Sequence, residues 1–213
     1  MKNKMNETEI LDVAWKLLAT EGLDNFSMRK LSQLLNIKAP SLYWYVKSKE
    51  QIFDKLASQV IQEGLKEVKK ADQWQQQLIF YGEILFQKLR KYPYSAHLLL
   101  RTTPNNPELL KLNNELLKVI DHQPLTDGQK FTSINTLMNY IISFEIDYLA
   151  QKENQVNVTP ESEKQSLADY ASDEPIARIM QSDVLDTLGS KEAFEWGLMI
   201  FVEGLGELIK GKE

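Results

Sequence analysis

The amino-acid sequence predicts an all-α fold, with an N-terminal three-helix unit containing a helix-turn-helix and a C-terminal helical domain. Apolar residues recur at the three- and four-residue spacing of amphipathic helices along most of the chain. Ser, Asn and Pro residues stand where helices begin or end, and no run of alternating β-branched residues predicts a strand. With 213 residues, the chain is long enough to bury a sizeable core in one or two domains.

The first two predicted helices lie near the N-terminus. Residues from Ile10 to Thr20 predict an amphipathic helix. Ser27 is placed to cap a second helix, since a Ser hydroxyl accepts hydrogen bonds from the first free amides. The apolar positions of this second helix fall on one face: Met28, Leu31, Leu34 and Leu35.

A tight turn and a third helix follow. Asn36 stands at the turn, where a left-handed backbone is often required and Asn tolerates it. Pro40 suits the first turn of the next helix because its missing N–H has no intrahelical partner there. Leu42 and Val46, four residues apart, are expected to face inward. The pattern predicts a helix-turn-helix, whose second helix enters the major groove of DNA.

The remainder of the chain is predicted to be helical, with one polar interruption. Ser48 is the expected N-cap of a helix from Glu50 to about Lys70. The residues from Lys152 to about Ser172 are polar and are interpreted as a mobile loop. Further helices are expected at 74–91, 94–101, 107–120, 127–151, 175–180 and 191–210. We therefore expect an N-terminal domain at residues 1–50, a connecting helix at 51–70 and a C-terminal domain at 71–213.

The charge of the chain is unevenly distributed. The formal net charge is -5, yet residues 1–49 hold eight Lys or Arg and five Asp or Glu, whereas the remainder holds 17 and 25. Between Ser27 and Lys49 there are five positive charges and no acid, together with a Tyr-Trp-Tyr cluster. A basic segment with exposed aromatic residues is typical of nucleic-acid binding. The alternatives are a merely solvated face, or a helical adaptor whose basic head docks on an acidic protein; only DNA binding combines steep salt dependence with sequence preference.

On these residues, the N-terminal part of the chain resembles the DNA-binding domain of tetracycline-repressor (TetR) family regulators. The resemblance covers about Glu9 to Leu56, and it rests on the amphipathic first helix, on residues 21–27 and 29–32, and on residues 42–49. Asn36 departs from the Gly that the family usually has at the turn. The resemblance implies a ligand-responsive repressor that binds a palindromic DNA operator as a homodimer and is released by a small-molecule effector.

The DNA-binding residues are expected around the second helix of the helix-turn-helix. Arg29, Lys47 and Lys49 would mainly hold phosphates, with Lys38 as a further contact. Tyr43 would also bond a phosphate through its hydroxyl. Ala39 offers only apolar contact, for instance to a thymine methyl. The expected reading surface consists of Ala39, Pro40, Ser41, Tyr43, Trp44 and Tyr45.

The C-terminal helix indicates an interface. The segment from Ala193 to Ile209 is apolar around most of its circumference, so more than one face must be buried. Ala193, Gly197 and Gly204 lie near one stripe, where small residues allow another helix to approach. A central core helix of a monomer is the alternative. The resemblance favours a homodimer, in which the helices at 127–151 and 191–210 of two subunits form a four-helix bundle and present two recognition helices to successive major grooves.

Two sets of residues indicate an effector site. Glu145 lies on an apolar stripe, which requires that it be paired, placed at the dimer seam or exposed to a ligand pocket. His97 and Arg101 are one helical turn apart in an apolar run, where a His is more often a hydrogen-bonded core residue than a ligand. They match a His-Leu-x-x-Arg run of tetracycline-sensing family members, whose His binds the magnesium of the drug complex. The candidate effector-binding residues are His97, Arg101, Thr102, Met138, Ile142 and Glu145.

The residues around this run depart from those expected of a tetracycline sensor. Leu99 and Leu100 replace a small and a hydroxyl-bearing residue, and Thr102 stands where Pro is expected. The preceding helix, 74–91, lacks the Asn-Asn pair expected to hold the drug. We therefore expect a small-molecule effector other than tetracycline. His97 is the one candidate metal ligand.

Other classes of protein are disfavoured by composition. The chain has no Cys and two His, and it lacks a glycine-rich phosphate loop and the G-x-S-x-G and H-E-x-x-H motifs. We therefore expect neither an enzyme nor a cofactor. No apolar run reaches 18 residues, and no apolar segment near Met1 has the form of a signal peptide. A cytoplasmic location is the resulting expectation.

Overall fold

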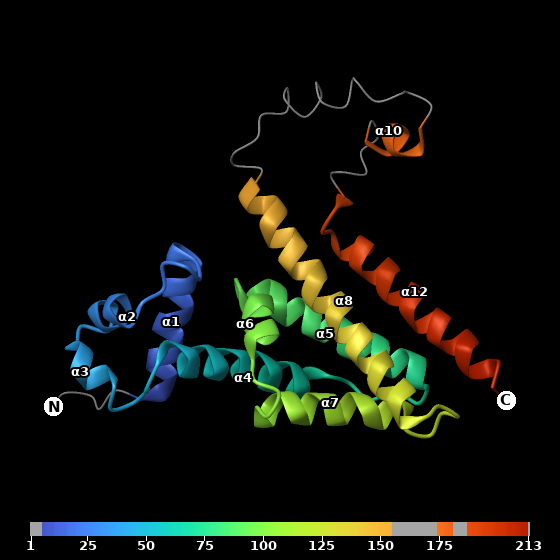
Figure 1. The fold of residues 1–213 in the computed structure, drawn as a ribbon, viewed down its shortest axis with the longest axis horizontal. Helices are drawn as coiled ribbons and strands as arrows, with labels where there is room; N and C mark the ends of the chain where they lie inside the picture. Colours follow the sequence, from blue (N-terminus) through green and yellow to red (C-terminus); the bar gives the residue numbers. More distant parts are fainter. Residues whose placement is uncertain (1–5, 155–173, 181–186, 213) are drawn as a thin grey trace.

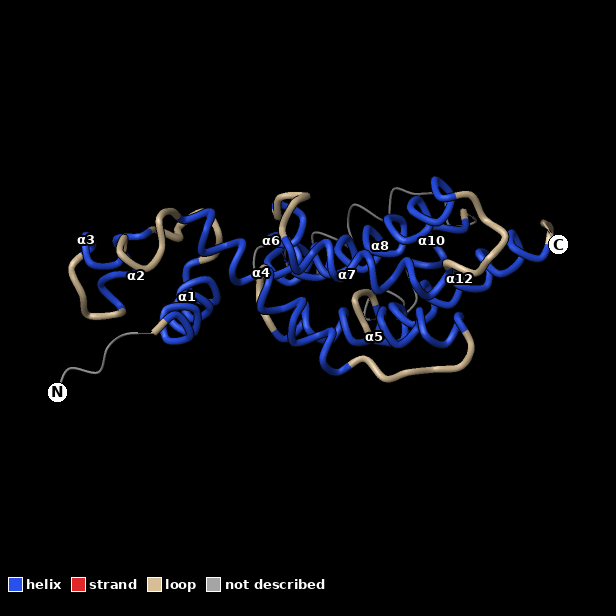
Figure 2. Tube along the Cα trace, turned by 90° about the horizontal axis from the view of Figure 1, so that it is seen from below, coloured by secondary structure: helices blue, strands red, loops and turns tan. Residues whose placement is uncertain are grey.

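Helices form every regular element in the described part of the chain, as the sequence predicts. The computed structural model describes residues 6–154, 174–180 and 187–212. Figure 1 shows a small N-terminal group of helices beside a larger helical body, and in Figure 2 the two groups lie at opposite ends of the molecule. None of the helices in the described ranges is long and apolar enough to cross a membrane.

The N-terminal group, which we call the head, contains α1 (Glu7–Glu21), α2 (Met28–Leu34) and α3 (Ala39–Leu42). The hydroxyl of Ser27 accepts a hydrogen bond from the Lys30 amide at 3.2 Å, which caps α2. Asn36 adopts a φ of 53°, so the predicted left-handed turn is confirmed. Leu42 and Val46 are fully buried, also as predicted.

Helix α3 is shorter than the spacing of its apolar residues indicates. It ends at Leu42, and Tyr43, Trp44 and Tyr45 form turns. The Tyr45 amide bonds the Leu42 carbonyl at 3.0 Å, and such three-residue bonds tighten the chain. The turn still returns Val46 to the core, because the Val46 amide also bonds the Leu42 carbonyl.

Helix α4 (Lys49–Glu67) runs from the head into the body. Its N-cap is Ser48, whose hydroxyl accepts from the Gln51 amide at 3.2 Å, as predicted. Helix α4 contacts α1 at one end and α5, α6 and α7 along the rest of its length. The two parts of the molecule are therefore joined by one continuous helix.

The body is built around a central helix, α5 (Trp74–Lys91), which packs against α4, α7, α8 and α12. The predicted helix ends agree with the structure to within three residues, except that residues 152–154 belong to α8 rather than to a loop. The remainder of that predicted loop, 155–172, lies outside the described residues. The other body helices are α6 (Ser95–Arg101), α7 (Pro107–Ile120), α8 (Asp127–Asn154), α10 (Pro175–Met180) and α12 (Lys191–Lys210).

An aromatic cluster fills the centre of the body. The Phe194 ring stacks on Phe86 at 4.2 Å and on Tyr140 at 5.4 Å between centroids, and Phe144 meets it edge-on at 5.3 Å. The Tyr140 hydroxyl donates to the Phe194 carbonyl at 2.7 Å. A Cβ at Gly197 would lie 2.2 Å from the Tyr140 hydroxyl, so the small residue makes room for the Tyr140 ring of α8.

Candidate DNA-binding and effector sites

The outer surface of the head carries three aromatic side chains. Trp44 is 83% exposed, and Tyr43 and Tyr45 are also exposed, whereas Leu42 and Val46 beneath them are buried. Exposed aromatic side chains grouped in this way mark a binding surface more often than an isolated one does. Of the other residues of the predicted reading surface, Pro40 and Ser41 are exposed and Ala39 is half-buried.

Basic side chains flank this aromatic group. Arg29, Lys38 and Lys47 are exposed, and Lys47 Nζ lies 3.4 Å from the Tyr43 carbonyl oxygen. Lys38 directly precedes α3 as its N-cap residue. Lys30 is engaged elsewhere, because its ammonium lies 2.6 Å from the Glu21 carboxylate. Lys38 and Lys47 therefore stand at the two ends of the segment that carries the aromatic group.

Lys49 is placed differently from the other predicted phosphate-binding residues. It begins α4, and its Nζ donates to the Leu23 carbonyl at 3.0 Å. The same ammonium lies 5.2 Å from the centre of the Phe53 ring and 5.8 Å from that of Phe26, within cation–π range. Lys49 thus bonds the α1–α2 loop, and a contact from it to DNA stays a proposal.

A cavity of about 240 Å³ in the body contains two of the predicted effector residues, His97 and Glu145. Glu145 is 6% exposed and is paired with Arg90: Arg90 Nε lies 2.8 Å from Oε2, and a terminal guanidinium nitrogen lies 2.6 Å from Oε1. Arg90 also donates to the Gly189 carbonyl at 2.9 Å and stacks 3.5 Å over the Tyr148 ring. The sequence left Glu145 to be paired, at the dimer seam or lining a ligand pocket; the structure shows it paired with Arg90 at the edge of a cavity.

A second cavity, of about 400 Å³, lies where the head meets the body. It brings His97 and Arg101 against the loop from Gly22 to Asn25, which joins α1 to α2. Tyr94, His97 and Leu149 line both cavities. These three side chains therefore form a wall shared by the cavity beside the Arg90–Glu145 pair and the cavity beside the head.

Tyr94 links the head and the body. Its backbone is left-handed, with φ of 64°, and its hydroxyl donates to Glu153 of α8 at 2.8 Å. Gly22 is also left-handed (φ 71°), and a Cβ there would lie 3.1 Å from the Tyr94 hydroxyl oxygen. Nearby, the Trp15 and Tyr92 rings stand 4.7 Å apart. The junction is therefore tightly packed and sensitive to movement of either part.

His97 has an unusual environment. Its Nδ1 is buried and has no hydrogen-bond partner among the described residues. Burial, and then the positive charge of Arg101, lower the pKa of His97 below its ordinary value. No group of three His, Asp or Glu side chains able to hold a metal ion occurs in the described ranges, so the structure gives His97 no set of co-ligands.

The remaining predicted effector residues do not meet His97. Thr102, Met138 and Ile142 are buried but line neither cavity. The Thr102 hydroxyl donates to the Leu98 carbonyl at 2.9 Å and so closes α6. Sequence reasoning missed Arg90, Tyr94 and Tyr148. Arg90 could have been found from the sequence, because it lies four residues after Phe86 on an apolar helix face. It is a base on such a face, as Glu145 is an acid on another.

An apolar face of α12 is uncovered in the single chain. Trp196 is 63% exposed, and at Gly204 an added Cβ would meet nothing within 4 Å. The other exposed apolar residues of this face are Met199, Ile200 and Leu208, with Phe131 exposed at the start of α8. An apolar patch of this kind on a helix marks an interaction surface.

Comparisons with known proteins cover both parts of the chain. A family model described as "Tetracyclin repressor-like, C-terminal domain" matches residues 68–209, and one described as "Bacterial regulatory proteins, tetR family" matches residues 10–56. The tetracycline repressor protein class A from transposon 1721 of Escherichia coli is 26% identical over 206 residues, which are 96% of this chain and 92% of that protein.

Two solved structures share the fold. A possible TetR family transcriptional regulator from Streptomyces coelicolor A3(2) aligns with a TM-score of 0.78 at 20% identity, over 95% of this chain and 100% of that one. A TetR variant from Acinetobacter baumannii AYE in complex with minocycline aligns with a TM-score of 0.72 at 18% identity, over 97% and 99%. The head, the connecting helix and the body all take part in these alignments.

Proposed function

Since this chain belongs to the tetR family of bacterial regulatory proteins, which are transcriptional regulators and not enzymes, we propose that it is a repressor. It binds a palindromic DNA operator as a homodimer in the cytoplasm, and a small-molecule effector releases it. The tetracycline repressor class A of E. coli, similar over nearly its whole length, is a repressor by name.

The observation that carries this proposal is the aromatic group on the head. Tyr43, Trp44 and Tyr45 are exposed although a buried core lies directly beneath them, and basic side chains flank them. In the proposed complex, Arg29, Lys38 and Lys47 hold phosphates and fix the register, while Ser41 and the aromatic residues face base edges. Lys49 supports the surface from within, through its bond to the Leu23 carbonyl.

The proposed dimer forms through the apolar face of α12 together with α8. Trp196, Ile200 and Leu208 lie along one side of α12, and the uncovered Gly204 between them allows a second helix to approach closely. A two-fold interface places the same face of each subunit against its copy, and it sets the two heads on successive major grooves. This symmetry is the reason to expect a palindromic operator.

The proposed effector binds at His97. Its buried, unpartnered Nδ1 offers a hydrogen bond in a position shared by both cavities, and the second cavity is bounded by the α1–α2 loop of the head. A ligand there favours body conformations in which Tyr94 and the loop stand apart, so it shifts the population towards a dimer with wrongly spaced heads.

The proposed effector is smaller than the minocycline named in the complex of the A. baumannii neighbour. The cavity beside Glu145 measures about 240 Å³, below the usual range for sites of drug-sized ligands. The Arg90–Glu145 pair and the aromatic cluster around Phe194 occupy the space between α5, α8 and α12. We therefore propose an effector other than tetracycline, with a polar group for His97.

The test of the DNA-binding function is selection of bound sequences from a random duplex pool at moderate salt. We expect enrichment of a palindrome with half-sites about one helical turn apart. Trp44→Ala should weaken binding to that operator without changing the dimer, and Lys16→Ala, which removes an exposed charge on α1 away from the aromatic group, is the control. Salt-sensitive binding without any enriched sequence would instead favour a head that docks on an acidic protein.

A further inference from the structure

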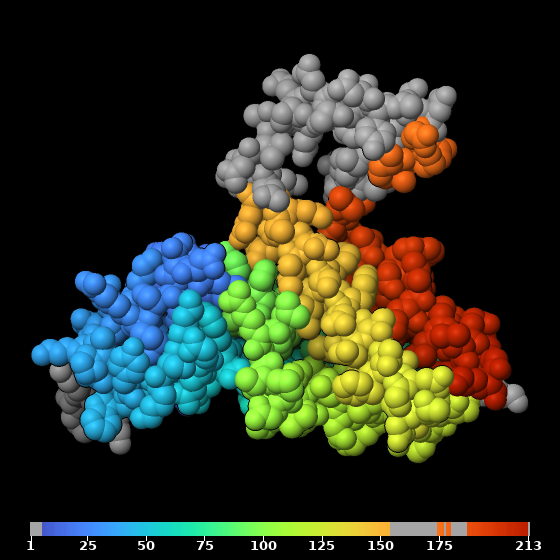
Figure 3. All heavy atoms as spheres, viewed as in Figure 1, coloured from blue at the N-terminus to red at the C-terminus, as the bar shows by residue number. Residues whose placement is uncertain are grey.

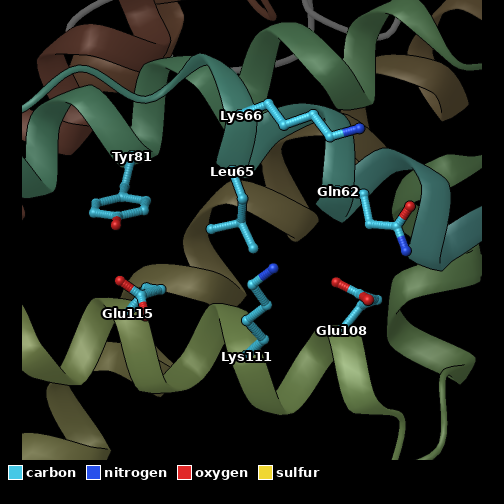
Figure 4. A pocket seen from close by; sticks show the side chains of 7 residues that line it. All are labelled: Gln62, Leu65, Lys66, Tyr81, Glu108, Lys111 and Glu115. Carbon is cyan, nitrogen blue, oxygen red and sulfur yellow. The ribbon is translucent and has the colours of Figure 1, made fainter.

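A third cavity lies between α4, α5 and α7. Its volume is about 390 Å³, which is within the range of small-molecule sites. Figure 4 shows Tyr81, Leu65 and Lys111, from α5, α4 and α7, pointing into this space, whereas Lys66 runs along α4. The lining residues are Gln62, Leu65, Lys66, Tyr81, Glu108, Lys111 and Glu115.

The cavity contains charges that the protein itself leaves without partners. Glu108 Oε2 is buried and accepts no hydrogen bond from any described residue. Neither Lys66 nor Lys111 forms an ion pair within the described ranges, although acids stand on the neighbouring turns of α7. A buried carboxylate oxygen without a donor is costly and calls for a partner that is not part of the chain.

Lys66 and Lys111 are exposed at this cavity, whereas Tyr81 and the Glu108 Oε2 atom are buried. Elsewhere on α7, Lys118 and Glu115 form an ion pair at 2.8 Å, one helical turn apart. Lys111 stands one turn from both Glu108 and Glu115, yet it points into the cavity towards Leu65. Tyr81 is buried, and Figure 4 shows its hydroxyl directed into the same space.

The mixture of charges restricts the ligand. A simple anion would be attracted by Lys66 and Lys111 but repelled by Glu108 and Glu115, and a simple cation would meet the reverse difficulty. A molecule that carries both charges gives Glu108 a donor and the lysines an anion, while Glu115 keeps its ion pair with Lys118. Leu65 and the Tyr81 ring supply an apolar wall between the charged groups.

We propose that this cavity binds a small zwitterion of the amino-acid type with an apolar side chain. The ligand ammonium bonds Glu108 Oε2, the carboxylate meets Lys111 and Lys66, and the apolar side chain lies on Leu65 and Tyr81. The site shares no lining residue with either His97 cavity, so it is distinct from the proposed effector site.

The position of the cavity connects it with the head. Gln62 and Glu108 also line a neighbouring cavity of about 500 Å³, whose other wall includes Glu7, Thr8 and Leu11 of α1. The Ser58 hydroxyl and the Asn106 side chain exchange hydrogen bonds across this region, at 3.0 and 3.4 Å, and fix α4 to the start of α7. A ligand at Glu108 therefore lies next to the helix that carries the head.

The experiment is isothermal titration of the purified full-length protein, without DNA, with L-phenylalanine and L-leucine. Phenethylamine and 3-phenylpropanoate serve as probes that carry only one of the two charges. We expect the amino acids to bind at least tenfold more tightly than either single-charge probe. Glu108→Gln and Lys111→Met should each weaken amino-acid binding at least tenfold, whereas Asp12→Asn and Lys16→Met, which make the same charge changes on the exposed face of α1, should not.

The proposal would be overturned if neither amino acid gave a heat of binding at concentrations up to about 10 mM. It would also be overturned if a single-charge probe bound as tightly as the amino acids. A third contrary result would be amino-acid binding that is lost in His97→Ala but kept in Glu108→Gln. Thermal unfolding of each variant, followed by circular dichroism, separates lost binding from lost structure. The titration does not depend on operator binding, so its failure leaves the proposed repressor function untouched.

Discussion

The Arg90–Glu145 ion pair provides the sharpest test of how the body is held together. We consider Arg90→Met, which keeps the length of the side chain but leaves Glu145 without its charged partner. The Glu145 side chain is 5% exposed and receives three N–H contacts from Arg90, between 2.6 and 3.1 Å. Removal of one partner of a buried pair costs about 3 to 5 kcal/mol, because an uncompensated charge remains in the interior.

The expected loss for Arg90→Met lies at the lower end of that range. The Arg90 side chain is 30% exposed, so its removal admits water towards the Glu145 carboxylate and reduces the penalty. We therefore expect a loss of about 3 kcal/mol in the free energy of unfolding, which corresponds to a fall of about 6 to 12 °C in Tm for a chain of this length. Glu145→Gln should cost only about 1 kcal/mol, because the Arg90 guanidinium still reaches solvent and still bonds the Gly189 carbonyl.

The assay is urea unfolding at pH 7, followed by circular dichroism at one fixed protein concentration, since dimers gain stability with concentration. Lys118→Met, which breaks an exposed ion pair on α7, is the control and should change stability by less than about 0.5 kcal/mol. In the double variant Arg90→Met/Glu145→Leu, most of the stability should return. Equal losses for Arg90→Met and Glu145→Gln, or a loss below about 1 kcal/mol for the former, would refute the reasoning.

Four further variants test the head, the junction and the interface. Lys49→Met should cost about 1 kcal/mol of unfolding free energy, because it removes the donor to the Leu23 carbonyl. Gly22→Ala should cost about 1 to 2 kcal/mol, since its φ is 71° and the Tyr94 hydroxyl lies close. The pKa of His97 is lower in the folded chain than the value of about 6.5 expected in the unfolded chain, so the unfolded state is protonated first as pH falls and the free energy of unfolding decreases. Between pH 7.5 and 5, His97→Gln should therefore lose less unfolding free energy than the native chain, as measured by urea unfolding at each pH. Ile200→Asp should shift the protein to monomer in sedimentation velocity, and an unchanged dimer would place the interface elsewhere.

The elements that the sequence predicted best are those set by local chemistry. Ser27 and Ser48 cap the helices that follow them, and Asn36 takes the left-handed backbone, because each depends only on residues within four positions. The burial of Leu42 and Val46 follows from helical spacing in the same way. Because Leu42 and Val46 face the core, Trp44 between them faces outward.

The features that sequence reasoning missed are those set by contacts between distant segments. Glu145 was recognised as a buried acid, but its partner Arg90 lies 55 residues away, and no local rule connects them. The bond from Lys49 to the Leu23 carbonyl is of the same kind, because it depends on how α4 meets the α1–α2 loop; the phosphate contact of Lys49 stays a prediction. The stripe of small residues predicts that another helix approaches Gly197, but the sequence does not identify it as α8, whose Tyr140 ring lies 57 positions away.

Helix α4 behaves mechanically as a rigid arm. Its 19 residues span about 28 Å at 1.5 Å per residue, from the body to the head at one end of the molecule in the space-filling view (Figure 3). A tilt of about 7° at the body end would displace the far end by about 3.4 Å, the rise of one base pair along a DNA strand. In a two-fold dimer the opposite displacements add, so such a tilt of α4 would place the two heads out of phase by two base pairs.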